Sequence, residues 1–365
     1  MRLKKRIVAG ALAVIIMFTS VSLPQGYVMA GKNNDAAKMI DIETKDSQKE
    51  TTLDSKAAIA DSVVFRDDDI KHGTVNEEYG YIRWAVDAQG KLTAAGWGDY
   101  AKPTDGTLEL GEYHREAPWY YDAWGFIDTG GIKTAEINII GMTDASFMFC
   151  VCTNMESINL SGLDTTNVKN MDEMFWGCNS LEYLDLSGFY TSNVKSMDGM
   201  FSCRRLKYLD LSSFNTKNVI GMRNMFDECN SLASIDLSGF DTSNVTNMGG
   251  MFRKCSSLTS IDLSGFDTSS VTSMHGMFEK CNSLVSIDLS GFDTSNVTDM
   301  SGMFGQCESL TDLDVSNFDT SKVCKMGSRG SMFGMFEGCS RLESLDLSGF
   351  NTGNVTDMRD MFSGC

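Results

Sequence analysis

The chain has 365 residues, of which 31 are basic and 49 are acidic, so its formal net charge is −18 at neutral pH. A chain this acidic is a poor match for the phosphates of nucleic acids and for anionic membrane surfaces. It suits a protein that attracts cations or basic partners.

Residues 1–30 have the features of a signal peptide. Basic side chains between Arg2 and Arg6 precede an apolar run at residues 7–18, and Val28-Met29-Ala30 offers a small-residue cleavage site. The apolar run is short for a bilayer span, and an uncleaved membrane anchor is the alternative. No cysteine lies near the cleavage site, so lipoprotein attachment is not supported. We expect a secreted or cell-surface protein with no membrane span after signal removal.

The next two segments differ in composition. Residues 31–60 are mostly polar and charged, which predicts a disordered linker. Residues 61–140 are predicted to form a β-rich N-terminal cap region, in which residues 81–87 and 91–98 are two strands joined by a glycine turn. A repeat stack needs a polar-faced cap at its end. The alternative is a carbohydrate-binding aromatic patch made by Trp84, Trp97, Trp119 and Trp124.

Residues 141–365 repeat one sequence unit. Residues 235–248 read I-D-L-S-G-F-D-T-S-N-V-T-N-M, and the unit restarts at Ile261 and Ile287, a step of 26 residues. A fixed period in this range predicts a solenoid, because one such unit cannot bury its apolar side alone. A degenerate unit at residues 148–158 precedes seven others, which start at Leu184, Leu209, Ile235, Ile261, Ile287, Leu313 and Leu345.

Within one unit, the apolar pattern changes its period. Ile261 and Leu263 alternate with polar residues, as in a half-exposed strand. After turn-forming residues at 267–270, apolar residues recur at steps of three and four from Val271 to Cys281, which favours a short helix or 3₁₀ turn. The expected fold class is an α/β solenoid. Its parallel β-sheet is leucine-rich-repeat-like, with the short helix or 3₁₀ turns on the other face.

The unit L-x-L-S-x-F-x-T-x-x-V-x-x-M-x-x-M-F-x-x-C-x-S-L resembles the 26-residue repeat of BspA-like leucine-rich surface proteins. Listerial and mycoplasmal surface lipoproteins use a similar unit. The resemblance covers residues 148–365. It implies a bacterial surface protein that adheres to host or neighbouring cells. One departure is Phe240, Phe266 or Phe292 where leucine-rich repeats have Asn. We therefore expect no Asn hydrogen-bond ladder and an aromatic stack in its place.

The last part of the chain departs from the regular pattern. The unit at Leu313 carries an insertion at residues 327–333, which is either a binding loop or neutral drift in a tolerant loop. The sequence stops at Cys365 inside the pattern, with no closing cap. We expect it to be a truncated piece of a longer chain.

Nine of the eleven cysteines occupy one repeat position, from Cys152 to Cys365. Secretion permits disulfides between adjacent repeats. An odd column cannot pair fully, however, and the position lies on the apolar stripe, so we expect buried thiols. No metal site is predicted, because the cysteines have neither a C-x-x-C spacing nor a neighbouring histidine.

The candidate binding residues are aspartates at one position of the strand. Side chains at this position point away from the core and form a line on the exposed sheet face. In the conservative interpretation, these aspartates keep the exposed sheet face soluble. In the functional interpretation, they form a stripe that binds a partner or divalent cations. The residues are Asp185, Asp210, Asp236, Asp262, Asp288, Asp314 and Asp346.

The sequence offers no catalytic residues and no cofactor site. Its histidines, His72, His114 and His275, have no nucleophile motif beside them. We therefore predict a non-catalytic protein whose repeat surface recognises extracellular proteins or glycans. The alternative is a passive stalk that presents a missing C-terminal domain, which could be an enzyme.

Overall fold

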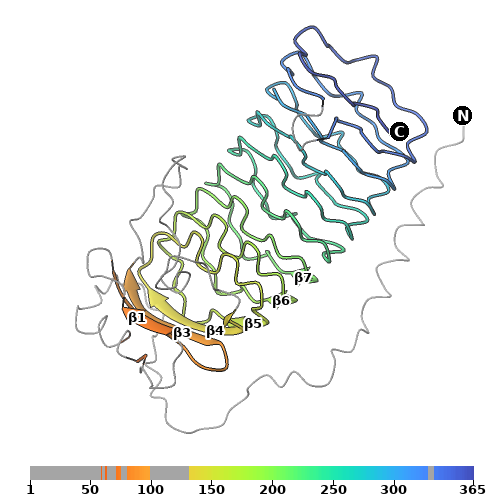
Figure 1. Ribbon diagram of the computed structural model, residues 1–365. Coiled ribbons are helices and arrows are strands. Elements are labelled where there is room, and N and C mark those ends of the chain that lie inside the picture. The colour runs from red at the N-terminus through yellow and green to blue at the C-terminus, as the bar shows by residue number, and fades with distance from the viewer. Residues whose placement is uncertain (1–58, 60–61, 64–70, 75–79, 99–130, 328–332) are drawn as a thin grey trace, which may run out of the picture. The chain divides into compact units, whose positions relative to one another are not determined.

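The computed structural model describes residues 59, 62–63, 71–74, 80–98, 131–327 and 333–365 (Figure 1). All of these lie in one compact unit, Thr51–Cys365. The predicted signal peptide and linker, at residues 1–30 and 31–60, lie outside the described residues apart from Ile59.

A five-stranded sheet opens the described part of the chain. Its strands, in spatial order, are β1 (Lys71–Thr74), β2 (Gly80–Val86), β3 (Lys91–Gly98), β4 (Thr134–Ile140) and β5 (Ser157–Asn159). The β1–β2 and β2–β3 pairs are antiparallel, whereas β3–β4 and β4–β5 are parallel. The predicted hairpin is confirmed, because β2 and β3 pair in register from Gly80↔Gly98 to Val86↔Leu92. Its turn contains Gly90 at φ 82°, and Asp87 Oδ1 accepts the N–H of Lys91.

The repeats pair in parallel. Strands β6 (Tyr183–Leu184) and β7 (Tyr208–Leu209) form a second, two-stranded parallel sheet. Single parallel bridges connect equivalent residues of neighbouring repeats, and Figure 1 shows their coils lying side by side from the yellow to the blue part of the chain. Apart from Ser286↔Asp312, the isolated bridges among the described residues form one continuous series, which runs through Asp144, Asn170, Ser196, Gly221, Asn247, Ser273, Asp299, Lys325 and Asp357.

The methionine-rich edge of each repeat forms turns with i→i+3 hydrogen bonds, such as Met251 N–H to the Met248 carbonyl at 3.2 Å, which are of the 3₁₀ type. The alternative expected there, a short helix, is wrong, and almost none of the described residues are helical. Gly250 and Lys254 have φ of 66° and 60°, and a helix does not accommodate this left-handed region. The N–H groups of Met248, Gly250, Phe252 and Lys254 donate instead to carbonyls of the next repeat, at 2.7–3.0 Å. Alternate residues thus form a ladder between repeats.

Buried apolar columns fill the space inside the stack. Equivalent Val, Met, Phe, Cys and Leu side chains of successive repeats join one continuous core. The phenylalanine of the Met-Phe pair stacks along the whole series, with ring centroids 5.5–6.1 Å apart from Phe149 to Phe362. In the column of Phe240, where we expected the aromatic stack, the described ring pair is Phe189–Phe214 at 6.5 Å. The main stack therefore lies in a different column.

Two polar ladders reinforce the stack. The buried Thr242 hydroxyl donates to the carbonyl oxygen of Asp267 in the next repeat at 2.9 Å, and equivalent threonines do the same. The amide of Asn244 donates to the carbonyl of Lys217 in the preceding repeat, and Asn296 donates to that of Ser269. The position of Phe240 has no Asn and therefore no Asn ladder, as expected. The Asn bonds of the T-x-N-V segment form a ladder at a different position, which was not predicted from the sequence.

The cysteine column consists of free thiols, as expected. From Cys178 to Cys365, each thiol of the column donates to the carbonyl oxygen of the phenylalanine one repeat earlier, as Cys255 does to Phe226 at 3.2 Å and Cys281 to Phe252 at 3.1 Å. Burial raises the pKa of Cys281 to about 12. Cys281 is therefore protonated at neutral pH, and the buried thiols of the column act as small core side chains.

Candidate functional site

The predicted aspartate column lies on the surface. All seven residues, from Asp185 to Asp346, are exposed, and neighbours such as Asp236, Asp262 and Asp288 interact electrostatically along the stack. The structure thus brings the predicted residues together in one line. Their binding role stays a prediction.

Each aspartate of this column also has a local structural role. Its Oδ1 accepts the N–H of the serine two residues later, as in Asp236–Ser238 at 2.9 Å and Asp262–Ser264 at 3.0 Å. This backbone hydrogen bond lowers the pKa of Asp236 and Asp262, although carboxylates of the neighbouring repeats act in the opposite direction. The column is therefore ionised at neutral pH and presents a line of negative charge.

Exposed tyrosines are a second feature of this face, and sequence reasoning missed them. Tyr183 and Tyr208 are 59% and 62% exposed and are register partners across β6 and β7. Other units have Ser234, Ser260 and Ser286 at the same position. A comparison of the repeats at this position would have found them, because other units have serine there.

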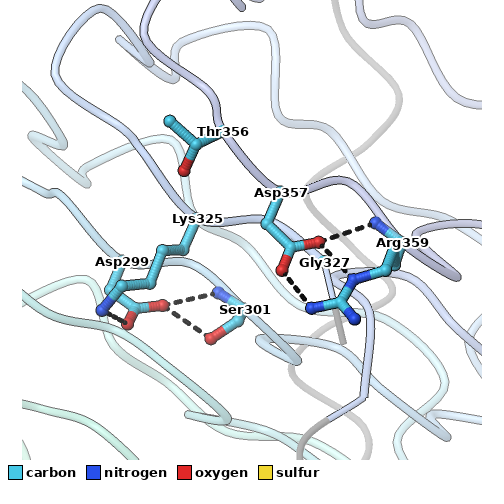
Figure 2. A pocket seen from close by; sticks show the side chains of 7 residues that line it. All are labelled: Asp299, Ser301, Lys325, Gly327, Thr356, Asp357 and Arg359. Carbon is cyan, nitrogen blue, oxygen red and sulfur yellow. Dashed lines mark hydrogen bonds and ion pairs between the residues drawn. The ribbon is translucent and has the colours of Figure 1, made fainter. Parts of the chain in front are cut away.

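A pocket of about 430 Å³ lies on the bridge column in the later repeats (Figure 2). Figure 2 shows Lys325 reaching Asp299, at 3.0 Å, and Arg359 folded onto Asp357, at 2.7 Å. Each cation in the pocket is therefore already paired with a carboxylate. The pocket includes Gly327, the first residue of the predicted insertion, whose residues 328–332 lie outside the described part.

Two carboxyl groups in the early repeats have strongly raised pKa values. Burial, together with the nearby Asp198 carboxylate, raises the pKa of Asp172 to about 7, and burial raises that of Asp198 to about 6. Asp172 Oδ1 accepts bonds from the Ser196 hydroxyl at 2.5 Å and the Asp198 N–H at 2.9 Å. These bonds hold the acid between repeats, which is a structural role.

A serine–histidine pair in the bridge column does not make a catalytic triad. Ser273 Oγ lies 2.9 Å from His275 Nδ1, and burial lowers the pKa of His275. Asp299, whose charge acts on His275, is engaged by Ser301 and Lys325. A triad needs that third group to orient the imidazole.

Only some of the other predicted features fall on described residues. Trp84 is buried and Trp97 half-buried, so neither matches the exposed sugar-binding patch considered as an alternative. Trp119 and Trp124 lie outside the described residues, as does His114; of His72 only the backbone is described, in β1.

The described residues contain no group of three His, Cys, Asp or Glu side chains placed to hold a metal ion. No described helix has the length and apolarity needed to cross a membrane.

The chain matches one family model, described as Mycoplasma protein of unknown function, DUF285. Overlapping matches cover residues 131–234, 203–286, 222–330 and 284–365, which together make up more than half of the chain. The match confirms the resemblance to mycoplasmal repeat proteins. No curated protein matches the chain.

Three crystal structures are similar to the chain. A leucine-rich repeat protein from Bacteroides ovatus is 16% identical, with 82% of this chain and 92% of that chain covered and a TM-score of 0.29. One from Eubacterium ventriosum is 13% identical, with coverages of 81% and 96% and a TM-score of 0.26. A leucine rich cell surface protein from Faecalibacterium prausnitzii is 16% identical, with coverages of 77% and 96% and a TM-score of 0.23.

Proposed function

The chain belongs to the family described as Mycoplasma protein of unknown function, DUF285, and we propose that it is a non-catalytic recognition protein of a bacterial cell surface. Its repeats would form a leucine-rich-repeat-like solenoid whose exposed face binds extracellular proteins or glycans. The proposal includes secretion through the predicted signal peptide and adhesion to host or neighbouring cells.

The observation that supports this proposal is the ionised aspartate column. Asp236, Asp262 and Asp288 are exposed, and each is fixed by a hydrogen bond to its own turn. The core beneath them is buried and hydrogen-bonded between repeats, so the charges have a rigid support. A fixed line of like charge favours a partner with complementary basic groups or bound divalent cations.

A control column makes the proposal testable between two variants of equal total charge. Asp241, Asp267 and Asp293 are also exposed, and Asp241 and Asp267 accept a backbone N–H two residues later at 3.0–3.1 Å, as Asp293 does at 2.9 Å. Replacing three aspartates by Asn in either column removes the same charge. Asn keeps the Oδ1 acceptor, so the turns are retained.

The experiment measures binding of the purified full chain to immobilised matrix proteins and mucin. We expect saturable binding that is weakened at least fivefold by the triple substitution at Asp236, Asp262 and Asp288, and unchanged by the control triple. Equal loss in both variants would show a general charge effect. Binding that is retained in the first variant would place the site elsewhere and overturn the proposed face.

The second candidate, a passive stalk, has support from the same repeats. Their ladders are continuous from Ala145 to Phe336, as a spacer requires. The absence of binding to every surface tested would favour the stalk.

A further inference from the structure

Tyr208 forms the wall of a hollow on the exposed sheet face. The hollow has a volume of about 310 Å³ and lies between β7 and the following repeat. Asp210 and Ser212 line it from the repeat of Tyr208, and Asp236 and Ser238 line it from the next repeat. It therefore combines one aromatic side chain with two carboxylates of the aspartate column.

The floor and walls of this hollow are held in place. Leu211 and Phe240 beneath it are buried in the core. Asp210 Oδ1 accepts the N–H of Ser212 at 2.9 Å, and Asp236 Oδ1 accepts that of Ser238 at 2.9 Å. These bonds lower the pKa of both carboxyl groups, so each is ionised at neutral pH. Each bond engages one oxygen of an exposed carboxylate.

The basic side chains nearest to Tyr208 in the sequence are already paired. Lys207 Nζ lies 2.7 Å from Glu182 Oε2, and Arg205 also pairs with Glu182. Arg204 pairs with Glu228 at 2.7 Å. These ion pairs leave the two negative charges of the hollow without a basic side chain among its lining residues.

We infer that the hollow binds a lysine or arginine side chain from a basic segment of a partner protein. The cation lies between the carboxylates of Asp210 and Asp236, and its alkyl stem or guanidinium plane packs on the Tyr208 ring. This inference rests on the proposed recognition function and specifies the partner of its aspartate face. A glycan would use the tyrosine ring and the hydroxyls, but it would not need the two negative charges.

The test uses a labelled hexa-arginine peptide and the purified full chain, with binding followed by fluorescence anisotropy. Tyr208→Ser should weaken binding about threefold, the scale of an exposed cation–π contact. Ser occupies this position in other repeats, so the fold is retained. The pair Asp210→Asn and Asp236→Asn should weaken binding about fivefold. The matched pair Asp267→Asn and Asp293→Asn, from the control column, removes the same charge outside the hollow and should leave binding nearly unchanged.

Three results would overturn the inference. The first is that the two aspartate pairs weaken peptide binding equally, which would mean that the overall negative charge, and not the hollow, attracts the peptide. The second is equal binding of hexa-citrulline, which has the same shape without the charge. The third is unchanged binding by Tyr208→Ser.

Adhesion to the immobilised surfaces is measured in parallel. If the chain binds hexa-arginine as expected but no surface, the proposed function fails and the cation site stands. If it binds a surface but not the peptide, the inference fails and the proposed function stands.

Discussion

Thr242 and Asp267 exchange two hydrogen bonds between neighbouring repeats. The Thr242 hydroxyl donates to the carbonyl oxygen of Asp267 at 2.9 Å and accepts the N–H of the same residue at 2.9 Å. One buried side chain thus satisfies both backbone groups of a residue in the next coil. The same pair recurs between Thr268 and Asp293.

Thr242→Val should therefore destabilise the stack. Valine keeps the shape but leaves the N–H and C=O of Asp267 without these partners, and we expect a loss of about 2 kcal/mol in the free energy of unfolding. Thr272→Val is the control, because the Thr272 hydroxyl makes an exposed bond. Urea unfolding checks both. Equal stability of the two variants would contradict a structural role for the threonine ladder.

The thiol column should resist alkylation in the folded chain. A thiolate is the reactive form, and burial keeps the pKa of Cys255 and Cys281 far above neutral. Treatment with iodoacetamide at pH 8 should modify the exposed Cys365 and the half-buried Cys324 first. Mass spectrometry should find the buried cysteines modified only after denaturation. Disulfide-linked peptides between adjacent repeats would contradict the free-thiol column.

Asp172 should make stability depend on pH. Its folded pKa of about 7 lies above the ordinary value of 3.8, so the folded state binds the proton more tightly. The contribution of Asp172 is therefore fully present below about pH 4 and is lost as the pH rises towards 7. Asp172→Asn should raise the stability at pH 8, by an amount on the order of 2 kcal/mol, and change it little at pH 4.

Thermal unfolding at several pH values checks this prediction. Asn retains an Oδ1 acceptor for the Ser196 hydroxyl and the Asp198 N–H. The charged groups that act on Asp172 are Asp198 and Asp144, and both raise its pKa. Asp185→Asn is the control. Because the pKa of Asp185 is lowered in the folded state, this substitution should change the stability at pH 8 in the opposite direction. A stability gain at pH 4 equal to that at pH 8 would refute the assignment.

The left-handed positions of the turn edge predict which residues the repeats tolerate. Gly276 has φ 57°, and Asn224 holds the equivalent place at φ 55°. A Cβ at Gly276 would meet its nearest atom, Glu279 Oε2, at 3.3 Å, at the end of a flexible side chain. Gly276→Asn should thus be nearly neutral. Gly276→Val should cost about 2 kcal/mol more, because β-branched residues avoid this region. Equal unfolding midpoints for the Asn and Val variants would contradict this left-handed requirement.

The sequence predicted the repeat and the first hairpin because both have strong local signals. The 26-residue step locates every core column, and Gly90 marks the turn between β2 and β3. It did not predict the turn edge, since left-handed positions are held by Glu173, Lys254 and Gln306 as well as by glycine. Such residues alone do not distinguish a turn from a helix.

The candidate site was predictable only in part. The aspartate column follows from strand alternation, which places Asp236 and its equivalents outside the core. The column of Phe240 has the stacked pair Phe189–Phe214, but the longer stack, in the Met-Phe column, was not predicted, because the period alone does not give the spacing between rings. The raised pKa of Asp172 depends on burial between repeats, where other units have residues such as Gly249 and His275.

Carboxyl footprinting is the most direct test of recognition by the aspartate column, because it needs no substitution. The full chain is labelled with a carbodiimide and an amine, free in solution and bound to immobilised mucin or matrix protein. We predict that labelling of Asp236, Asp262 and Asp288 falls on binding, while labelling of Asp241, Asp267 and Asp293 does not. Equal labelling of both columns with and without the surface would contradict recognition by the aspartate face.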